Sequence, residues 1–207
     1  VHYHEIGLKG RNRASFERRL RDNLAAAARD LTDEPVERIS SRLLVRASDP
    51  RRIDELADRL AMIPGVSSVS SAFMTGRDID EIDRAALLAI ADAGEASSFA
   101  IDARRSTTDF PMSSLDMNRA VGQFVVDSTG MSVNLGAPDV TCWVEVVQGD
   151  AYVYSRKVRG AGGLPVGTAG KVVALLSAGI DSPVAAWRLM KRGAVVVAVH
   201  FSGRPQT

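Results

Sequence analysis

The most constraining feature of the sequence is a short polar turn between an apolar run and a helix. The apolar residues 172–176 predict a buried strand, and the polar turn 177–182 follows it directly. Pro183 suits the first turn of a helix, where its missing N–H loses no partner. A second apolar run at 195–199 predicts the next strand of a parallel sheet. This order predicts an α/β unit whose helix N-terminus offers free N–H groups to an anion.

The residues of the turn narrow the choice of anion. The sequence has neither G-x-x-x-x-G-K-[ST] nor G-x-G-x-x-G, which excludes the common triphosphate loop and the dinucleotide fingerprint. Its Ser-Ala-Gly-Ile-Asp-Ser instead resembles the S-G-G-x-D-S PP-loop of the ATP pyrophosphatases, which split ATP between the α and β phosphates. An ordinary capped turn is the alternative. Ala178 replaces the usual glycine, and alanine is strained there if φ must be positive.

This resemblance implies an ATP site with Mg²⁺. Ser177 and Ser182 would donate hydrogen bonds to phosphate oxygens, and Gly179 would let the backbone approach them closely. Asp181 would hold a Mg²⁺ that bridges the phosphates. Residues at the ends of the two strands would flank the nucleotide: Leu175, Leu176, His200 and Phe201. A strand-end histidine with its own hydrogen bond is the alternative for His200.

Composition places further bounds on the chain. Its 207 residues suffice for one large or two small domains, and the net charge of +1 is segregated along the sequence. Residues 9–21 contain six Lys/Arg and one Glu, whereas residues 78–102 are acidic. Such segregation predicts basic patches that face a polyanion.

The sequence contains a single cysteine, which bears on disulfides, metal binding and cellular location. Cys142 excludes an internal disulfide and a cysteine-based zinc site, and a buried apolar role on a strand is expected for it. The sequence shows neither a signal peptide nor a long apolar span, so we expect a cytoplasmic protein with no membrane partner.

Residues 1–75 are predicted to form an α+β domain of ferredoxin-like type. The expected order of elements is β-α-β-β-α-β, with an apolar stripe four residues apart on the first helix. The expected strands are 1–8, 36–39, 43–47 and 66–74, and the expected helices are 14–31 and 49–63.

Residues 76–160 are predicted to form a second α+β domain. Helices are expected at 78–93 and 114–129, and strands at 98–102, 140–147 and 151–158. Helices followed by strands around a basic edge resemble the THUMP domain, an RNA-binding module of tRNA-modifying enzymes. A glycine-rich linker at 161–170 is expected to lead into the first β-α-β of an α/β PP-loop domain (adenine nucleotide alpha hydrolase-like) at 171–207.

Taken together, these features resemble the tRNA 4-thiouridine synthetase family. The resemblance rests on the strings at 3–13, 162–168, 177–185 and 199–201, and on the domain order. It implies an ATP-dependent sulfurtransferase that adenylates a uridine of tRNA, after which a persulfide sulfur displaces AMP to give 4-thiouridine. It also implies sulfur supply for the thiazole of thiamine. The implied partners are tRNA, a cysteine desulfurase or other persulfide donor and, as one option, a second copy of the chain.

Seven basic residues are candidates for contact with tRNA phosphates. They are Lys9, Arg11, Arg13, Arg104, Arg105, Lys157 and Arg159. A solvated basic face is an equally weighted alternative for each residue taken alone.

Two readings of the function stay open at this point. Since the sequence stops at Thr207 just after the second strand, we expect the N-terminal half of the enzyme, with the sulfur-handling cysteine beyond Thr207. The alternative is a non-catalytic tRNA-binding module with a vestigial nucleotide site. A THUMP-bearing methyltransferase is a weak third reading, because no methyl-donor loop is present.

Overall fold

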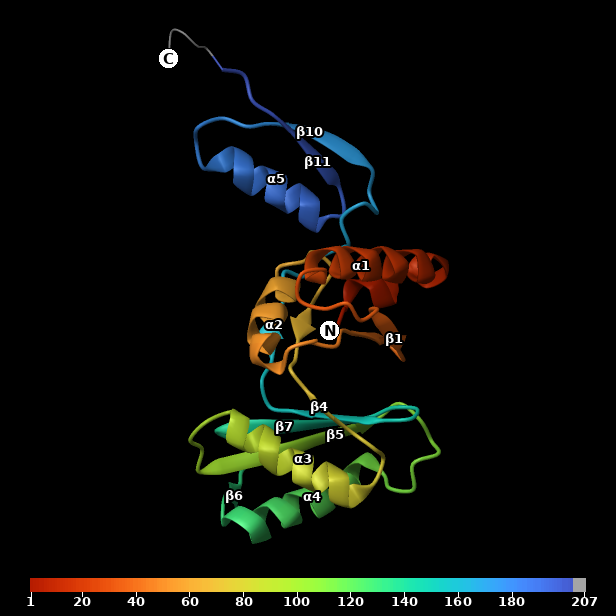
Figure 1. Cartoon of the computed structure of the whole chain (residues 1–207), viewed down its shortest axis with the longest axis vertical. Coiled ribbons are helices and arrows are strands. Elements are labelled where there is room, and N and C mark those ends of the chain that lie inside the picture. Colours follow the sequence, from red (N-terminus) through yellow and green to blue (C-terminus); the bar gives the residue numbers. More distant parts are fainter. Residues whose placement is uncertain (203–207) are drawn as a thin grey trace. The chain divides into compact units, whose positions relative to one another are not determined.

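The computed structural model describes residues 1–202 and divides into two compact units (Figure 1). One unit joins Val1–Val69 to the chain from Val158 onward, and the other is Ser70–Lys157. Residues 203–207, the end of the expected PP-loop domain, lie outside the described residues.

The first unit begins with a helix-hairpin-helix arrangement, as predicted. Leu20, Leu24 and Ala28 form the buried stripe of the first helix. Asp49 accepts a hydrogen bond from the N–H of Arg51 and so caps the turn that leads into the second helix. The elements are η1 (Glu5–Leu8), η2 (Gly10–Asn12), α1 (Arg13–Ala28), β1 (Glu37–Ile39), β2 (Arg42–Leu44), η3 (Pro50–Arg52) and α2 (Ile53–Ala61).

The strand predicted for residues 1–8 is wrong. Only His2 forms bridges, to Arg42 and Ser68, and the following residues form the 3-10 turn η1. This segment buries one apolar side chain completely, that of Ile6. A single buried anchor does not require the alternating face of a strand, so a tight turn satisfies it.

The strands predicted for 66–74 and 151–158 each divide into two pieces. β3 (Ser68–Val69) pairs antiparallel with β9 (Val158–Arg159), and both belong to the first unit. β4 (Phe73–Thr75) pairs antiparallel with β8 (Ala151–Tyr154), and both belong to the second unit. The breaks fall at residues 70–72 and 155–157, and the sequence alone does not show that the strands on either side pair in different sheets.

The second unit is a five-stranded mixed sheet with two helices on one face (Figure 1). The strand order is β4-β8-β7-β5-β6, in which β5 runs parallel to β6 and β7. Side chains of Phe99, Met117 and Val144 are fully buried between the sheet and the helices. Its remaining elements are α3 (Ile79–Asp92), β5 (Ser98–Arg105), α4 (Ser114–Thr129), β6 (Ser132–Val133) and β7 (Val140–Val146).

The predicted strand-loop-helix-strand unit is confirmed. It comprises β10 (Lys171–Leu175), α5 (Asp181–Lys191) and β11 (Val195–Val199), and the two strands are parallel. The strands pair in register, so both carboxyl ends reach the same edge. Val173 and Leu175 keep 65% and 64% of their surface exposed. The apolar surface of this small sheet is therefore only partly covered within the described residues.

Candidate functional site: the PP-loop and the basic surfaces

The parallel register of β10 and β11 brings the predicted strand-end residues together. The N–H of Leu176 donates to the carbonyl oxygen of Val199 over 2.8 Å, which continues the pairing one residue past β10. Nδ1 of His200 lies 2.9 Å from the carbonyl oxygen of Leu176. His200 therefore ties the two strand ends to each other, and the next residue, Phe201, is 78% exposed at the same edge.

The two serines of the loop face each other across the turn. The Oγ of Ser182 accepts a hydrogen bond from the N–H of Ser177 over 3.0 Å, and the two hydroxyl oxygens lie 3.2 Å apart. The N–H of Gly179 donates to the Oγ of Ser177 over 3.3 Å. The serine hydroxyls thus tie the two ends of the loop to each other.

The N-terminus of α5 is open. Among the described residues 1–202, no side chain at the N-cap position, Ile180, bonds to the first turn of this helix. By contrast, the side chain of Asp78 caps α3 and that of Ser113 caps α4. Asp181 is exposed in the first turn of α5. An uncapped helix N-terminus carries unsatisfied N–H groups and a partial positive charge. The loop therefore combines hydroxyl donors, backbone donors and one carboxylate.

The alanine in the second position of the loop is unstrained. Among residues 1–202, Ser40 is the only residue other than glycine with a positive φ, so Ala178 does not adopt the left-handed conformation. A Cβ at Gly179 would lie 3.6 Å from the Oγ of Ser177, an ordinary contact. The loop's backbone is therefore compatible with the methyl group of Ala178.

A metal ion at this loop would have few protein ligands. The described residues contain no cluster of three or more His, Cys, Asp or Glu side chains that could hold a metal. Mg²⁺ commonly takes one or two carboxylates and completes its shell with waters and substrate phosphates. The single carboxylate of Asp181 beside an open helix N-terminus fits that pattern, and it does not fit a metal held by protein alone.

The basic candidates of the first unit differ in how they are engaged. Nζ of Lys9 lies 5.4 Å from the ring centroid of Phe16, and Arg11 is exposed. Nε of Arg13 donates to the carboxylate of Glu17 over 2.7 Å, and Arg38 pairs with the other oxygen of that carboxylate over 2.9 Å. Glu17 is buried, so Arg13 has a structural role in neutralising it. Lys9 and Arg11 are the better candidates for phosphate.

The basic candidates of the second unit are also partly engaged. Arg104 makes two hydrogen bonds, of 3.1 and 2.9 Å, to the carboxylate of Asp102. Arg105 donates to the carbonyl oxygen of Phe110 over 2.9 Å. Nζ of Lys157 lies 5.6 Å from the ring centroid of Trp143. All three basic side chains remain exposed, so a phosphate could still reach them.

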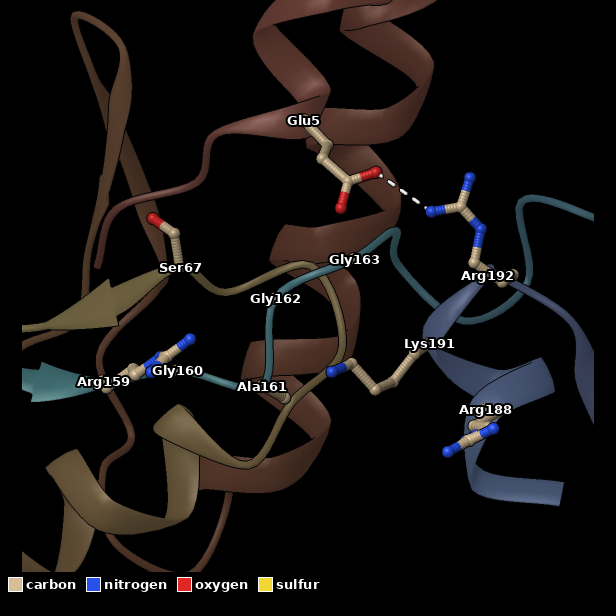
Figure 2. A pocket seen from close by; sticks show the side chains of 10 residues that line it. All are labelled: Glu5, Ser67, Arg159, Gly160, Ala161, Gly162, Gly163, Arg188, Lys191 and Arg192. Carbon is tan, nitrogen blue, oxygen red and sulfur yellow. Dashed lines mark hydrogen bonds and ion pairs between the residues drawn. The ribbon is translucent and has the colours of Figure 1, made fainter. Parts of the chain in front are cut away.

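The seventh candidate, Arg159, belongs to a cavity that sequence reasoning missed. We call it the linker pocket; its volume is about 650 Å³, and Figure 2 shows its lining. The lining comprises Glu5, Ser67, Arg159, Gly160, Ala161, Gly162, Gly163, Arg188, Lys191 and Arg192. Cations in the last turn of a helix usually balance its dipole, so nothing in the sequence indicates that those of α5 face a cavity.

The glycine-rich segment beside this pocket is fixed in place. The N–H of Gly160 donates to Ser67 and that of Gly162 to Val66, over 2.9 and 2.7 Å. A Cβ on Gly160 would lie 2.3 Å from the carbonyl oxygen of Val66, which no side chain could tolerate. The linker is thus part of the first unit's packed structure.

The one cysteine lies in the core of the second unit, as predicted. Cys142 is fully buried on β7, and burial raises the pKa of its thiol to about 12. A thiol in that state is a poor nucleophile.

Comparison with known proteins decides the family. Family models match in the order expected: a ThiI ferredoxin-like domain at residues 1–70, a THUMP domain at 76–156 and a thiamine biosynthesis protein (ThiI) at 167–207. A probable tRNA sulfurtransferase of Natranaerobius thermophilus is 35% identical over the whole chain, which covers 52% of that relative. The chain belongs to the tRNA sulfurtransferase family. It spans about half the length of the curated relatives of this family that it matches.

Solved structures agree with this assignment to the tRNA sulfurtransferase family. A 4-thiouridine synthetase solved in complex with RNA and bound ATP matches 99% of the chain at 33% identity, with a TM-score of 0.84, and is itself covered to 52%. PH1313 from Pyrococcus horikoshii matches the whole chain at 32% identity, with a TM-score of 0.86, and is covered to 68%. The predicted fold class is thereby confirmed. No helix within residues 1–202 is both long and apolar enough to cross a membrane.

Proposed function

We propose that this protein is a tRNA uridine 4-sulfurtransferase and that this chain is its N-terminal half. In this proposal the ferredoxin-like and THUMP parts dock tRNA, and the PP-loop holds the phosphates of ATP. The observation that carries the proposal is the open loop at the carboxyl edge of β10 and β11, where two serine hydroxyls converge beside an uncapped helix. The RNA and ATP bound to a solved 4-thiouridine synthetase of the same fold support it.

The loop residues have a defined task in the reaction we propose. The uridine O4 attacks the α-phosphorus of ATP and pyrophosphate leaves. The terminal sulfur of a persulfide then attacks C4 and expels AMP, and a second thiol breaks the remaining S–S bond, which leaves 4-thiouridine and a disulfide. Ser177, Ser182 and the N–H groups of α5 would hold the phosphates that become pyrophosphate, where the helix dipole favours their charge. Mg²⁺ bound to Asp181 would neutralise part of that charge.

Several finer parts of the proposal go beyond the loop. The sulfur would come from a cysteine desulfurase or another persulfide donor, through a cysteine outside this chain, because Cys142 is buried with a raised pKa. The name of the family model matched at residues 167–207 supports an additional role in thiamine thiazole synthesis. We further propose a cytoplasmic location and a homodimer as the working state.

The test is pyrophosphate release by the protein expressed from its whole gene, with tRNA and ATP supplied. We expect Asp181→Ala to abolish release and to leave tRNA binding nearly unchanged, because Asp181 is not among the candidate tRNA contacts. The matched control is Asp58→Ala, since Asp58 is an exposed carboxylate on α2 outside the loop. Normal release by Asp181→Ala would refute the assignment of this loop. If the unaltered protein bound tRNA without releasing pyrophosphate, the non-catalytic reading would hold instead.

A further inference from the structure

The linker pocket has the charge of an anion site. Four of its lining side chains are cationic, Arg159, Arg188, Lys191 and Arg192, and only Glu5 is acidic. Glu5 pairs with Arg192 over 3.2 Å. Within residues 1–202, Arg159, Arg188 and Lys191 form no ion pair, so at least three cations remain uncompensated around one cavity.

Balance of the helix dipole does not account for these cations. The last carbonyl groups of α5 already accept backbone hydrogen bonds: Leu189 from Arg192, Met190 from Gly193 and Lys191 from Leu164, over 2.9–3.0 Å. The side chains of α5 are therefore not needed as caps. Arg159 comes from a different element, β9. Figure 2 shows that Lys191 extends from α5 toward Ala161 of the linker.

The glycine segment 160–163 keeps one wall of the pocket free of large side chains. A Cβ at Gly160 or Gly163 would approach a carbonyl oxygen to 2.3 or 2.1 Å, so both positions require glycine. The lining contains no aromatic residue on which a base could stack. A smooth cationic cavity without a base platform suits the backbone phosphate of a nucleic acid better than a nucleotide.

We propose that the linker pocket binds backbone phosphate of the tRNA, through Arg159, Arg188 and Lys191. The proposal rests on the proposed function and adds a tRNA contact on the helix that also carries the PP-loop. The pocket is distinct from the ATP site, because α5 has 11 residues and therefore separates its two ends by about 16 Å. tRNA held there would lie against the unit that holds ATP.

The experiment measures tRNA binding by the 207-residue chain as a function of salt concentration. Arg188→Ala/Lys191→Ala is compared with Arg29→Ala/Arg84→Ala, which removes the same charge from exposed residues outside the pocket. Each lost phosphate contact lowers the log–log salt slope by about 0.9, so losing two lowers it by about 1.8. The ratio of the unaltered chain's affinity to that of the pocket variant should then be about 12-fold larger at 50 mM salt than at 200 mM salt. The control should show a much smaller change.

Two further variants separate the pocket from a general loss of charge or of folding. Arg188→Lys/Lys191→Arg keeps the charge and should keep most of the slope. Glu5→Gln removes the one acid and releases Arg192, so it should tighten binding and steepen the slope. Equal effects of the pocket and control double variants, with normal binding by the unaltered chain, would overturn this inference alone. Absence of tRNA binding by the unaltered chain would overturn the proposed function as well.

Discussion

Replacing Gly163 by alanine should destabilise the first unit far more than the same change at its neighbour Gly162. Both residues have positive φ, +79° and +69°, so each alanine is strained by about 1–2 kcal/mol. At Gly162 a Cβ meets no atom within 4 Å. At Gly163 it would lie 2.1 Å from the carbonyl oxygen of Lys191, which accepts a 2.9 Å hydrogen bond from Leu164.

The extra cost at Gly163 follows from that contact. The oxygen must move by more than 1 Å to reach an ordinary separation, which sacrifices a hydrogen bond worth about 1 kcal/mol. Displacing the end of α5 adds about 1–3 kcal/mol of overpacking. Gly163→Ala should therefore cost about 2–4 kcal/mol more than Gly162→Ala.

Thermal unfolding followed by tryptophan fluorescence checks this difference. The sequence has two tryptophans, and a Trp143→Phe background leaves Trp187 of α5 to report on the first unit alone. The expected difference in Tm is at least about 4 °C. Equal Tm values for the two variants would refute the claim that the linker is packed against α5.

Three smaller predictions concern single residues. Cys142 should resist thiol reagents at pH 8 in the native state and react on unfolding, because burial raises its pKa to about 12; rapid native labelling would contradict this. Hydrogen bonds from Ser97 and Ser98 lower the pKa of Asp139 in the folded protein to about 2, which is below its pKa in the unfolded chain. The ionised carboxylate therefore stabilises the fold fully above about pH 4, and this stabilisation is lost as the pH falls to about 2. Asp139→Asn should thus lower Tm at pH 7 and converge with the parent as the pH falls to about 2; a pH-independent difference would argue against it. Ala178→Gly should leave pyrophosphate release equal or higher, since Ala178 has no positive φ, and a large loss would show that the methyl group is required.

The sequence was sufficient wherever local chemistry decides the structure. Pro183 and the apolar runs on either side predicted β10, α5 and β11, and Gly130 with φ of +72° ends α4 where the pattern predicted. Serines and an aspartate between a strand and a helix likewise predicted the polar turn in which Ser177 and Ser182 face each other. These signals act within a few residues, so a single sequence contains them.

The sequence was insufficient wherever distant segments decide the structure. The strand predicted across residues 66–74 changes partner between β3 and β4, and only the positions of β8 and β9 reveal this. Arg13 looked like a free basic residue because its partner, Glu17, is buried by packing that no local pattern shows. The linker pocket was missed for the same reason. Arg159 and the basic residues of α5 are far apart in the sequence, and they line one cavity only because the linker between them folds back.

The most direct test of the central claim is the nucleoside content of tRNA in cells that lack the gene encoding this chain. The account predicts that 4-thiouridine disappears from the tRNA of such cells, as measured by mass spectrometry of its nucleosides. Restoring the gene should return the nucleoside, whereas the same gene carrying Asp181→Ala should not. Unchanged 4-thiouridine in the deleted cells, or full restoration by the Asp181→Ala gene, would contradict the account.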